Sequence, residues 1–214
     1  NEPSMLYDSE GTYIDNLPTD EERYKITLDE MSDYLKDAFI AIEDERFETH
    51  PGIDIKRTIG SALRSAIYYV TGEGSVQGGS TLTQQLIRNT LLSQDVKIER
   101  KIREIYLSLQ LEKKLSKDQI LEAYLNTIPL GSNVYGVEAA ARYFFEKNAK
   151  DLNLAESAFI AGLTQAPTSY SPYNPANKED PSIYLDRTKT VLMKMKDLGK
   201  ITQEEYDEAY AFVD

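Results

Sequence analysis

The sequence predicts a mainly α-helical protein. Over most of its 214 residues, apolar side chains recur every three or four positions, the period of a helix with one buried face. No βαβ alternation and no internal repeat is present in the sequence. Extended or irregular structure is expected only in residues 1–27, where turn signals at 8–11 and 16–18 flank short apolar stretches.

The first half is expected to form two helices, a loop and two further helices. Apolar residues at helical spacing predict a helix over 28–44, and Pro51 biases His50 away from the helical conformation. A second helix is expected over 55–70. The four glycines within 71–79 predict a mobile loop, after which Ser80 can cap a helix that runs to Leu92. The next helix carries one apolar stripe, made by Ile98, Ile102, Ile105 and Leu109.

The second half also reads as helical. Ser116 and Gln119 have the spacing of a capping box, which predicts a helix that ends near Asn126. Two helices are expected over 137–144 and 154–165, and an ordered loop over 166–182, which is rich in Pro, Tyr, Ser and Asn. The last two helices are expected over 183–198, stopped by Gly199, and over 203–212, opened by Thr202 with Glu205.

The charge balance limits the ligands. A net charge of −12 argues against general nucleic-acid binding. Residues 1–50 hold fifteen acidic and four basic side chains, whereas residues 97–117 hold seven basic and three acidic ones. A basic patch in an acidic protein suits a specific anionic ligand, although a solvated helix face would give the same pattern.

The residues that are missing narrow the chemistry. With no cysteine and one histidine, the sequence predicts no disulfide framework and no zinc site. No run of 18 apolar residues is present, so no membrane-spanning helix is expected in these residues. The abrupt start at Asn1 without a signal peptide leads us to expect that the chain is part of a longer protein.

Three clusters could carry chemistry. Glu43 and Asp44 end an apolar helix, where partial burial can favour a general base, although an acidic helix surface reads the same way. Hydroxyls and amides after the glycines could hold a sugar or phosphate at a helix start, or merely cap that helix; they are Ser80, Thr81, Gln84 and Gln85. His50, the single histidine, is expected to have a structural or hydrogen-bonding role.

The third cluster lies in the basic segment. Arg100, Lys101 and Glu104 share roughly one helix face, so the two cations could neutralise a diphosphate beside an ionised carboxylate. A surface ladder of ion pairs would have the same spacing.

Taken together and in order, these segments resemble the family 51 glycosyltransferases, the peptidoglycan polymerases. Glu43-Asp44-x-x-Phe47-x-x-His50-x-Gly52 is similar to the first family motif, and Gly79-Ser80-Thr81-x-Thr83-Gln84-Gln85 to the second. Arg100-Lys101-x-x-Glu104 is similar to the third, and the stretch from Lys117 through Tyr124 to Asn126 to the fourth. The fifth is weaker: Arg187 fits, but Thr188 stands where a second arginine is common.

The resemblance implies a lysozyme-like, two-lobed fold, with a head lobe and a jaw lobe at the membrane. It places a linker segment in residues 1–27, the glycosyltransferase domain in 28–214 and the jaw lobe in about 53–80. The implied reaction joins lipid II to a growing glycan on undecaprenyl diphosphate, making β-1,4 bonds with inversion. The implied location is the extracytoplasmic face of the bacterial cell membrane.

The resemblance also implies roles for residues. Glu43 would deprotonate the acceptor's 4-hydroxyl, and Glu104 would lie near the leaving diphosphate. Substrate contacts are expected from the remaining motif residues, namely Asp44, Phe47, His50, Ser80, Thr81, Gln84, Gln85, Arg100, Lys101, Tyr124 and Asn126. The sequence shows no dedicated metal cage, so a divalent Mg²⁺ or Mn²⁺ would bridge the protein and the diphosphate.

The expected partners follow from the same family. They are lipid II with the growing glycan, the membrane surface through the jaw lobe, a downstream transpeptidase domain in the parent protein, and cell-wall assembly proteins. Tyrosines in 62–70 suit a membrane interface, although ordinary core packing would explain that stretch equally well.

Two other functions remain open from the sequence. A lytic enzyme on a lysozyme-like fold would also use a glutamate in a sugar cleft, but it would have no need of the Arg100–Lys101 pair. A non-catalytic wall-binding module would have no need of the two carboxylates of Glu43 and Glu104.

Overall fold

The computed structural model describes residues 5–7, 13–16, 22–72, 78–92 and 98–213, and it is mainly helical, as predicted. The α-helices are α1 (Asp33–Glu43), α2 (Ile55–Thr71), α3 (Leu82–Leu91), α4 (Ile98–Leu111), α5 (Lys117–Thr127), α6 (Val137–Phe145), α7 (Leu154–Gly162), α8 (Pro167–Tyr170), α9 (Pro175–Glu179), α10 (Ser182–Asp197) and α11 (Gln203–Val213). Short 3-10 helices are η1 (Leu28–Glu30), η2 (Ala149–Asp151) and η3 (Leu163–Gln165).

Strands play a small part in the described residues. β1 (Met5–Tyr7) pairs antiparallel with β2 (Tyr13–Asn16), and β3 (Glu22–Arg23) pairs parallel with β4 (Val134–Tyr135). The prediction that residues 1–27 are extended or irregular is confirmed where they are described. At the end of this range, Thr27 caps the 3-10 helix η1. The turn signals at 8–11, most of the one at 16–18, and residues 73–77 of the glycine loop lie outside the described residues.

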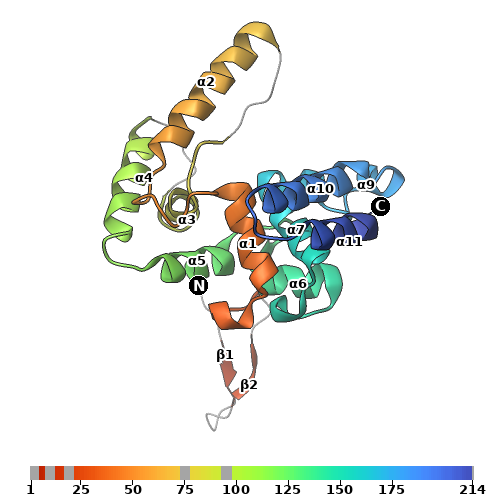
Figure 1. Ribbon diagram of the computed structural model, residues 1–214. Helices are drawn as coiled ribbons and strands as arrows, with labels where there is room; N and C mark the ends of the chain where they lie inside the picture. The colour runs from red at the N-terminus through yellow and green to blue at the C-terminus, as the bar shows by residue number, and fades with distance from the viewer. Residues whose placement is uncertain (1–4, 8–12, 17–21, 73–77, 93–97, 214) are drawn as a thin grey trace.

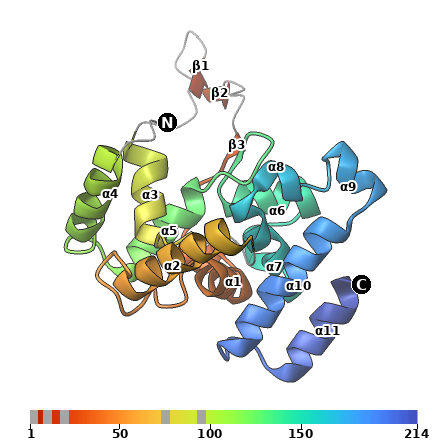
Figure 2. The ribbon, with the colours of Figure 1, turned by 90° about the horizontal axis from the view of Figure 1, so that it is seen from above.

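The main core is a stack of helices around α7. This helix packs against both α1 and α10, and α11 closes the group (Figure 2). Ala158, Ile160 and Ala161 of α7 are fully buried, as expected for a helix that is apolar on nearly all sides. This packing brings the end of α1 close to the end of α7 and the 3-10 helix η3.

A second group of helices lies beside this core. α3 packs between α4 and α5, and α2 extends away from the rest of the molecule (Figure 1). The Asp54 side chain caps α2 by accepting a hydrogen bond from the Arg57 N–H (2.9 Å), and Gly72, at φ +73°, ends the helix. Within the described residues, no helix has both the length and the apolar character needed to span a membrane.

The first helix begins later than predicted. Thr27 and Glu30 form a capping box that closes only a 3-10 turn, and Met31 is then extended at φ −115°. The chain straightens here because the Ser32 N–H donates to the carbonyl of Ala149 (3.1 Å), a contact between distant segments. The α-helix therefore starts at Asp33 rather than Leu28.

Two details of α3 and α4 also differ from prediction. Thr81, rather than Ser80, caps α3: its hydroxyl accepts from the Gln84 N–H (3.1 Å). The predicted apolar stripe of α4 is not its buried face, because Ile102 is 63% exposed whereas Glu104 and Ser108 are buried. The helix is turned so that a charged residue faces inward.

The helix signals in the second half are largely confirmed. Ser116–Gln119 and Thr202–Glu205 form the predicted capping hydrogen bonds, and Gly199 adopts φ +67° after α10. The predicted loop over 166–182 instead contains α8 and α9, each with a proline in its first turn. The predicted helix over 154–165 tightens into the 3-10 turn η3 for its last three residues.

Candidate active site

Glu43 is the last residue of α1, and its half-buried carboxylate is held from two sides. The Gln85 side-chain amide donates to Oε2 (2.7 Å), and the Thr164 hydroxyl donates to Oε1 (2.5 Å). Gln85 comes from α3 and Thr164 from η3, so the carboxylate lies where the two helix groups meet. Among the described residues, no basic side chain forms an ion pair with it.

Tyr124 extends this network into the core. Its hydroxyl donates to the Gln85 side-chain oxygen (3.1 Å), and its ring is fully buried against Phe39 at a centroid distance of 6.0 Å. Burial, followed by the negative charge of Glu43, raises the pKa of Tyr124 well above its ordinary value. The tyrosine therefore stays protonated and acts as a fixed donor. Its side chain is fully buried in this structure, and its expected substrate contact stays a prediction.

Arg187, from the weak fifth motif, approaches the same carboxylate. Burial lowers the pKa of Arg187, and the charge of Glu43 acts in the opposite direction. Its Nε donates to the carbonyl of Gly162 (3.2 Å). Thr188, which stands where an arginine was expected, is buried and donates to the carbonyl of Tyr184 (2.8 Å), so its role is in packing.

Asp44 and His50 form a buried pair beneath Glu43. Asp44 Oδ2 lies 2.8 Å from His50 Nε2 and accepts from the Leu82 N–H (2.9 Å) at the start of α3. His50 Nδ1 accepts from the Gly52 N–H (3.1 Å), so the imidazole proton is on Nε2 and points to Asp44. This arrangement joins α1 to α3. Both side chains are buried, and their expected substrate contacts stay predictions.

Phe47, Thr81 and Gln84 are also buried, and their expected substrate contacts stay predictions. Phe47 is fully buried, with the Lys117 ammonium 4.6 Å from its ring centre. Thr81 donates to the carbonyl of Gly52 (2.7 Å), and Gln84 accepts from the Thr81 N–H (3.0 Å). Each supports the chain around Glu43 and has no surface to offer a substrate in this conformation.

Glu104 forms a second charged cluster. Its buried carboxylate accepts a hydrogen bond from the Lys101 ammonium, which also donates to the Ser80 hydroxyl (3.1 Å). The Lys101 side chain is 44% exposed, so the cluster presents a positive group to solvent above a buried negative one. Arg100 Nε is buried and has no hydrogen-bond partner within the described residues. The predicted grouping of Lys101 with Glu104 is confirmed.

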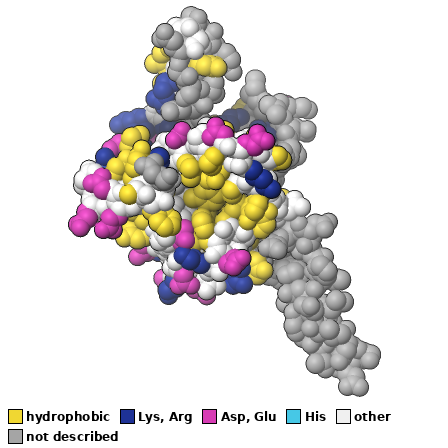
Figure 3. Space-filling view, turned by 90° about the vertical axis from the view of Figure 1, so that its right-hand side faces the viewer, with side chains coloured by type: hydrophobic (Ala, Val, Ile, Leu, Met, Phe, Trp, Pro, Cys, Tyr) yellow, Lys and Arg dark blue, Asp and Glu magenta, His cyan; other side chains and the backbone are white. Residues whose placement is uncertain are grey.

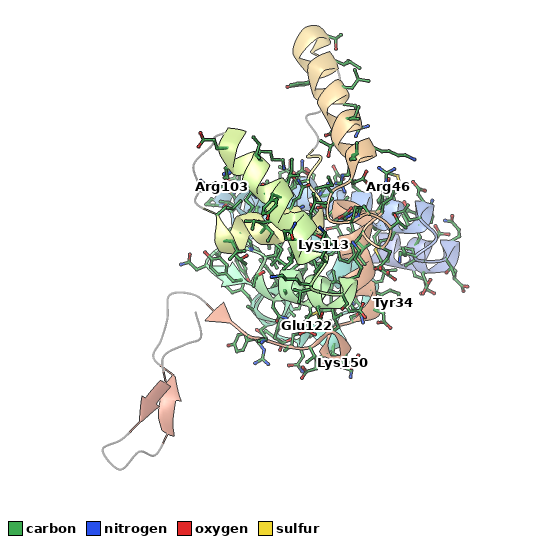
Figure 4. The ribbon with its side chains drawn as sticks, turned by 90° about the vertical axis from the view of Figure 1, so that its left-hand side faces the viewer. Tyr34, Arg46, Arg103, Lys113, Glu122 and Lys150 are labelled. Carbon is green, nitrogen blue, oxygen red and sulfur yellow. The ribbon has the colours of Figure 1, made fainter. Side chains whose placement is uncertain are left out.

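Asn126 does not lie in either cluster. Its side chain accepts from the Ile26 N–H (2.9 Å) and donates to the Ile26 carbonyl (2.8 Å), which reproduces the pairing of a neighbouring strand. Glu122 on α5 (Figure 4) accepts from the Leu28 N–H (3.2 Å). Asn126 holds the N-terminal segment against α5, and its expected substrate contact stays a prediction.

The base of α2 is fixed by ion pairs. Arg46, which lies beside this end of the helix (Figure 4), makes two hydrogen bonds to Asp54 at 2.7 and 2.8 Å. Burial opposes the ionisation of Asp54, but the hydrogen bond from Arg57 N–H and the charge of Arg46 outweigh it and lower the pKa of Asp54. The Arg57 guanidinium also donates to the Glu43 carbonyl, which links α2 to the end of α1.

Three functional candidates were not identified from the sequence. Thr164 carries no local signal, because its contact with Glu43 spans 121 residues. Arg57 reads as an ordinary charge near a helix start. Arg88, whose positive charge acts on Tyr124, follows Gln84 and Gln85 by one helical turn, and this spacing could have indicated it.

The donor chemistry bears on a metal ion. In the described ranges, no group of three or more His, Cys, Asp or Glu side chains could hold an ion. At the second cluster, the Glu104 carboxylate lies beside the partly exposed Lys101 ammonium. Since Mg²⁺ takes about six oxygen ligands, most of them would have to come from a substrate and water.

An apolar cavity of about 270 Å³ lies elsewhere, between α6, α7, α10 and α11. Its walls are largely aromatic, with Phe144, Phe159, Tyr173 and Tyr184 among the lining residues. Figure 3 shows hydrophobic side chains gathered on the face of the molecule that carries these helices. The cavity contains none of the residues predicted to bind substrate or to act in catalysis, so size alone does not mark the site.

Comparison with known families gives one clear match. Residues 10–196 fit the model of the family described as transglycosylase. Among curated proteins, the chain is 56% identical over 214 residues to penicillin-binding protein 1A of Clostridium perfringens (strain 13 / Type A), covering all of this chain and 32% of that protein. It is 40% identical over 205 residues to penicillin-binding protein 2D of Bacillus subtilis (strain 168), covering 96% of this chain and 28% of that protein.

A solved structure agrees. The crystal structure of penicillin-binding protein 1A from Haemophilus influenzae matches with a TM-score of 0.51 and 25% sequence identity, covering 98% of this chain and 20% of that one. The chain thus spans about a third or less of the length of the relatives it matches.

Proposed function

The chain belongs to the transglycosylase family, and on that premise we propose that it is a peptidoglycan glycosyltransferase with Glu43 as its general base. Its substrates are lipid II and a glycan carried on undecaprenyl diphosphate. The acceptor's 4-hydroxyl attacks the anomeric carbon of the donor, the bond from that carbon to the diphosphate breaks, and the configuration inverts. Asp44, His50, Phe47, Tyr124 and the α3 cap position this machinery.

The observation that carries the proposal is the environment of Glu43. Its carboxylate is only half buried and is oriented by two neutral donors, Gln85 and Thr164. A base must be held within hydrogen-bond reach of the proton that it takes and must not be occupied by a cation. Glu43 is oriented by neutral donors and has no ion-pair partner among the described residues, whereas Glu104 is buried and paired with Lys101.

The leaving diphosphate belongs at the second cluster. Negative charge grows on its oxygens as the glycosidic bond breaks, so a cation already in place stabilises the transition state more than the ground state. Lys101 is partly exposed and held by Glu104 and Ser80. Arg100 lies next to it in sequence, and its buried Nε has no hydrogen-bond partner among the described residues. Glu104 therefore acts by positioning Lys101, and the two cations meet the diphosphate.

A divalent cation, Mg²⁺ or Mn²⁺, is compatible with this cluster. Glu104 is the residue that would hold it, with diphosphate and water oxygens supplying the other ligands. When bound, such an ion neutralises charge on the departing diphosphate. The Lys101 contact to Glu104 would have to loosen to admit it.

The lipid-linked substrates place the enzyme at the extracytoplasmic membrane surface, and α2 is the element that meets the membrane. Ile55, Ile59, Leu63 and Ile67 recur every four residues along α2 and are 63%, 64%, 62% and 48% exposed. A projecting helix with an uncovered apolar stripe has the form of an interfacial helix that lies in a lipid surface. The jaw lobe, expected over about 53–80, would then include α2.

The decisive test is polymerisation by the purified chain. Lipid II, Mg²⁺ and detergent are incubated with the chain, and glycan products are resolved on a gel. The parent chain is expected to produce a ladder. Glu43→Gln keeps the side-chain size but cannot take the proton, and its rate is expected to fall by about 100-fold or more. Glu45→Gln is the matched control, since Glu45 is the exposed neighbour that pairs with Lys194.

The outcomes separate the candidate functions. Equal ladders from the parent and Glu43→Gln would remove Glu43 from the role of base. No ladder, but cleavage of preformed glycan strands, would indicate the lytic enzyme instead. Neither product from a folded chain that still binds glycan would indicate a wall-binding module.

A further inference from the structure

The two oxygens of the Glu43 carboxylate face donors of different kinds. Oε2 faces the Gln85 amide, whose own oxygen is occupied by the Tyr124 hydroxyl. The reversed amide would place its oxygen against a carboxylate oxygen, so this orientation is fixed whenever Glu43 is ionised. In this orientation Gln85 donates to Glu43 and cannot accept from it. Oε2 remains an acceptor, which leaves Oε1 as the oxygen that can carry a proton.

Thr164 faces Oε1 and differs from Gln85 in one respect. A hydroxyl can both donate and accept, whereas the amide nitrogen only donates. The Thr164 hydroxyl oxygen lies 2.5 Å from Glu43 Oε1 and 2.8 Å from the carbonyl oxygen of Ala161. It has one proton and two acceptors within reach. While Glu43 is ionised, the charged oxygen is the stronger acceptor, so the proton points to Oε1.

We propose that Thr164 is a positioning residue for Glu43 that serves the carboxyl group in both of its protonation states. This role rests on the proposed function, in which Glu43 is the general base. When Oε1 takes the proton of the attacking hydroxyl, the new O–H rotates about its C–O bond and donates to the Thr164 oxygen. The threonine's own proton then turns to the Ala161 carbonyl, and no heavy atom has to move.

The proton accounting is closed within these groups. The acceptor oxygen bonds to the anomeric carbon as its proton passes to Oε1, and the diphosphate leaves with the electron pair of the broken bond. Thr164 gains and loses no proton overall; its hydroxyl only rotates. The glutamic acid formed in the reaction is thereby held in place rather than left with an unpaired O–H.

Two substitutions separate the hydroxyl from the size of the side chain. Thr164→Val keeps the shape and removes the hydroxyl, and kcat is expected to fall about 10- to 100-fold, as for the loss of one hydrogen bond to a charged group. KM for lipid II should stay within about twofold, because Thr164 acts on Glu43 and not on the substrate. Thr164→Ser keeps the hydroxyl and should retain kcat within about threefold.

The experiment measures initial polymerisation rates over a range of lipid II concentrations for the parent chain and these variants. Thr190→Val is the matched control: its exposed hydroxyl donates to the carbonyl of Asp186 (2.8 Å), four positions earlier on α10, which is a comparable local bond without a carboxylate. Circular dichroism melts show whether each variant is folded. Glu43→Gln is run beside them to mark the loss of the base itself.

A fall in kcat for Thr164→Val with constant KM, restored by serine, supports the proposal. A folded Thr164→Val with the parent's kcat overturns it while leaving Glu43 as the base. Equal losses in the valine and serine variants, or a loss confined to KM, also overturn it, because the effect would then follow side-chain size or substrate binding. If the parent chain makes no polymer, the proposed function fails first, and this role fails with it.

Discussion

The carboxylates around the site differ in the groups that surround them, which are cations for some and neutral donors for Glu43. Three carboxylates are neutralised by what surrounds them: Asp44 by the start of α3 and the nearby Arg57, Asp54 by Arg46, and Glu104 by Lys101. Glu43 is the exception, since neutral donors orient it. Carboxylates that face cations hold structure, whereas a carboxylate oriented by neutral groups remains open to a proton. Acidic side chains therefore have two roles in the site: Glu43 is the proposed base, and the other three carboxylates stabilise the structure around it.

Asp54 provides a prediction of pH dependence. Because the pKa of Asp54 is lowered on folding, its stabilisation is complete above the ordinary aspartate pKa of about 3.9 and is lost as pH falls through the lowered value. At pH 7, Asp54→Asn is expected to reduce the free energy of unfolding by about 1–2 kcal/mol, since it weakens a helix cap and an ion pair. Urea unfolding at pH 7 and pH 3 measures the difference between the two proteins, which should shrink at the lower pH.

The matched control is Asp118→Asn, which changes an exposed aspartate in the first turn of α5. It should unfold close to the parent chain at pH 7. A gap between the parent and Asp54→Asn that is equally large at both pH values would contradict ionisation of Asp54 as its source.

Among the elements, α2 and α4 depart most from the rule that apolar faces are buried. Sequence periodicity locates both helices, but it does not say which face is covered. In α4 the tertiary contacts turn Glu104 and Ser108 inward and leave Ile102 and Tyr106 exposed. In α2 the apolar stripe has no cover among the described residues, since the helix projects from the body of the molecule (Figure 1).

The stripe on α2 leads to a second prediction. Replacing Ile59 and Leu63 together by aspartate should reduce binding to vesicles of phosphatidylglycerol and phosphatidylcholine by at least about tenfold, because each apolar side chain gains about 1–3 kcal/mol on burial. Vesicle co-sedimentation measures the bound fraction. Met193→Asp on α10 is the control, because Met193 is an exposed apolar residue of a different helix. Equal binding by all three proteins would remove α2 as the membrane contact.

At the scale of the whole molecule, residues of the fourth motif tie the N-terminal segment to α5. Asn126 and Glu122 bind the backbone of Ile26 and Leu28, roughly a hundred positions earlier in the chain. β3 and β4 pair next to this tie. The N-terminal segment is thereby fixed to the face of α5, on the opposite side of the helix groups from α2 (Figure 1).

Removing the tie should loosen this segment without disturbing the core. Asn126→Ala is expected to lower the free energy of unfolding by about 1–3 kcal/mol, because it leaves the backbone groups of Ile26 without their partners. Limited proteolysis should cut near residue 26 earlier than in the parent chain. Asn89→Ala, an exposed position on α3, is the comparison. Unchanged cleavage in Asn126→Ala would mean that other contacts hold the segment.

Local sequence patterns predicted most of the helices but did not give all of their boundaries. Capping residues and apolar periods located most helices, because both depend on neighbours within about four residues. The start of α1 at Asp33 was missed, because it is decided by a hydrogen bond between Ser32 and Ala149. The division into residues 1–27, a domain over 28–214 and a jaw over about 53–80 stays a prediction.

By itself, the sequence determined the helical class, the family, and the pairing of Lys101 with Glu104, which are three residues apart on one helix. Only the tertiary structure decided which motif residues are buried, as with Asp44 and Tyr124, and which hold a distant segment, as with Asn126. It alone brought Thr164 to Glu43 across 121 positions. The physical reason is range: helix formation is set by contacts a few residues apart, whereas burial and the orientation of a carboxylate depend on segments that meet only when the chain is folded.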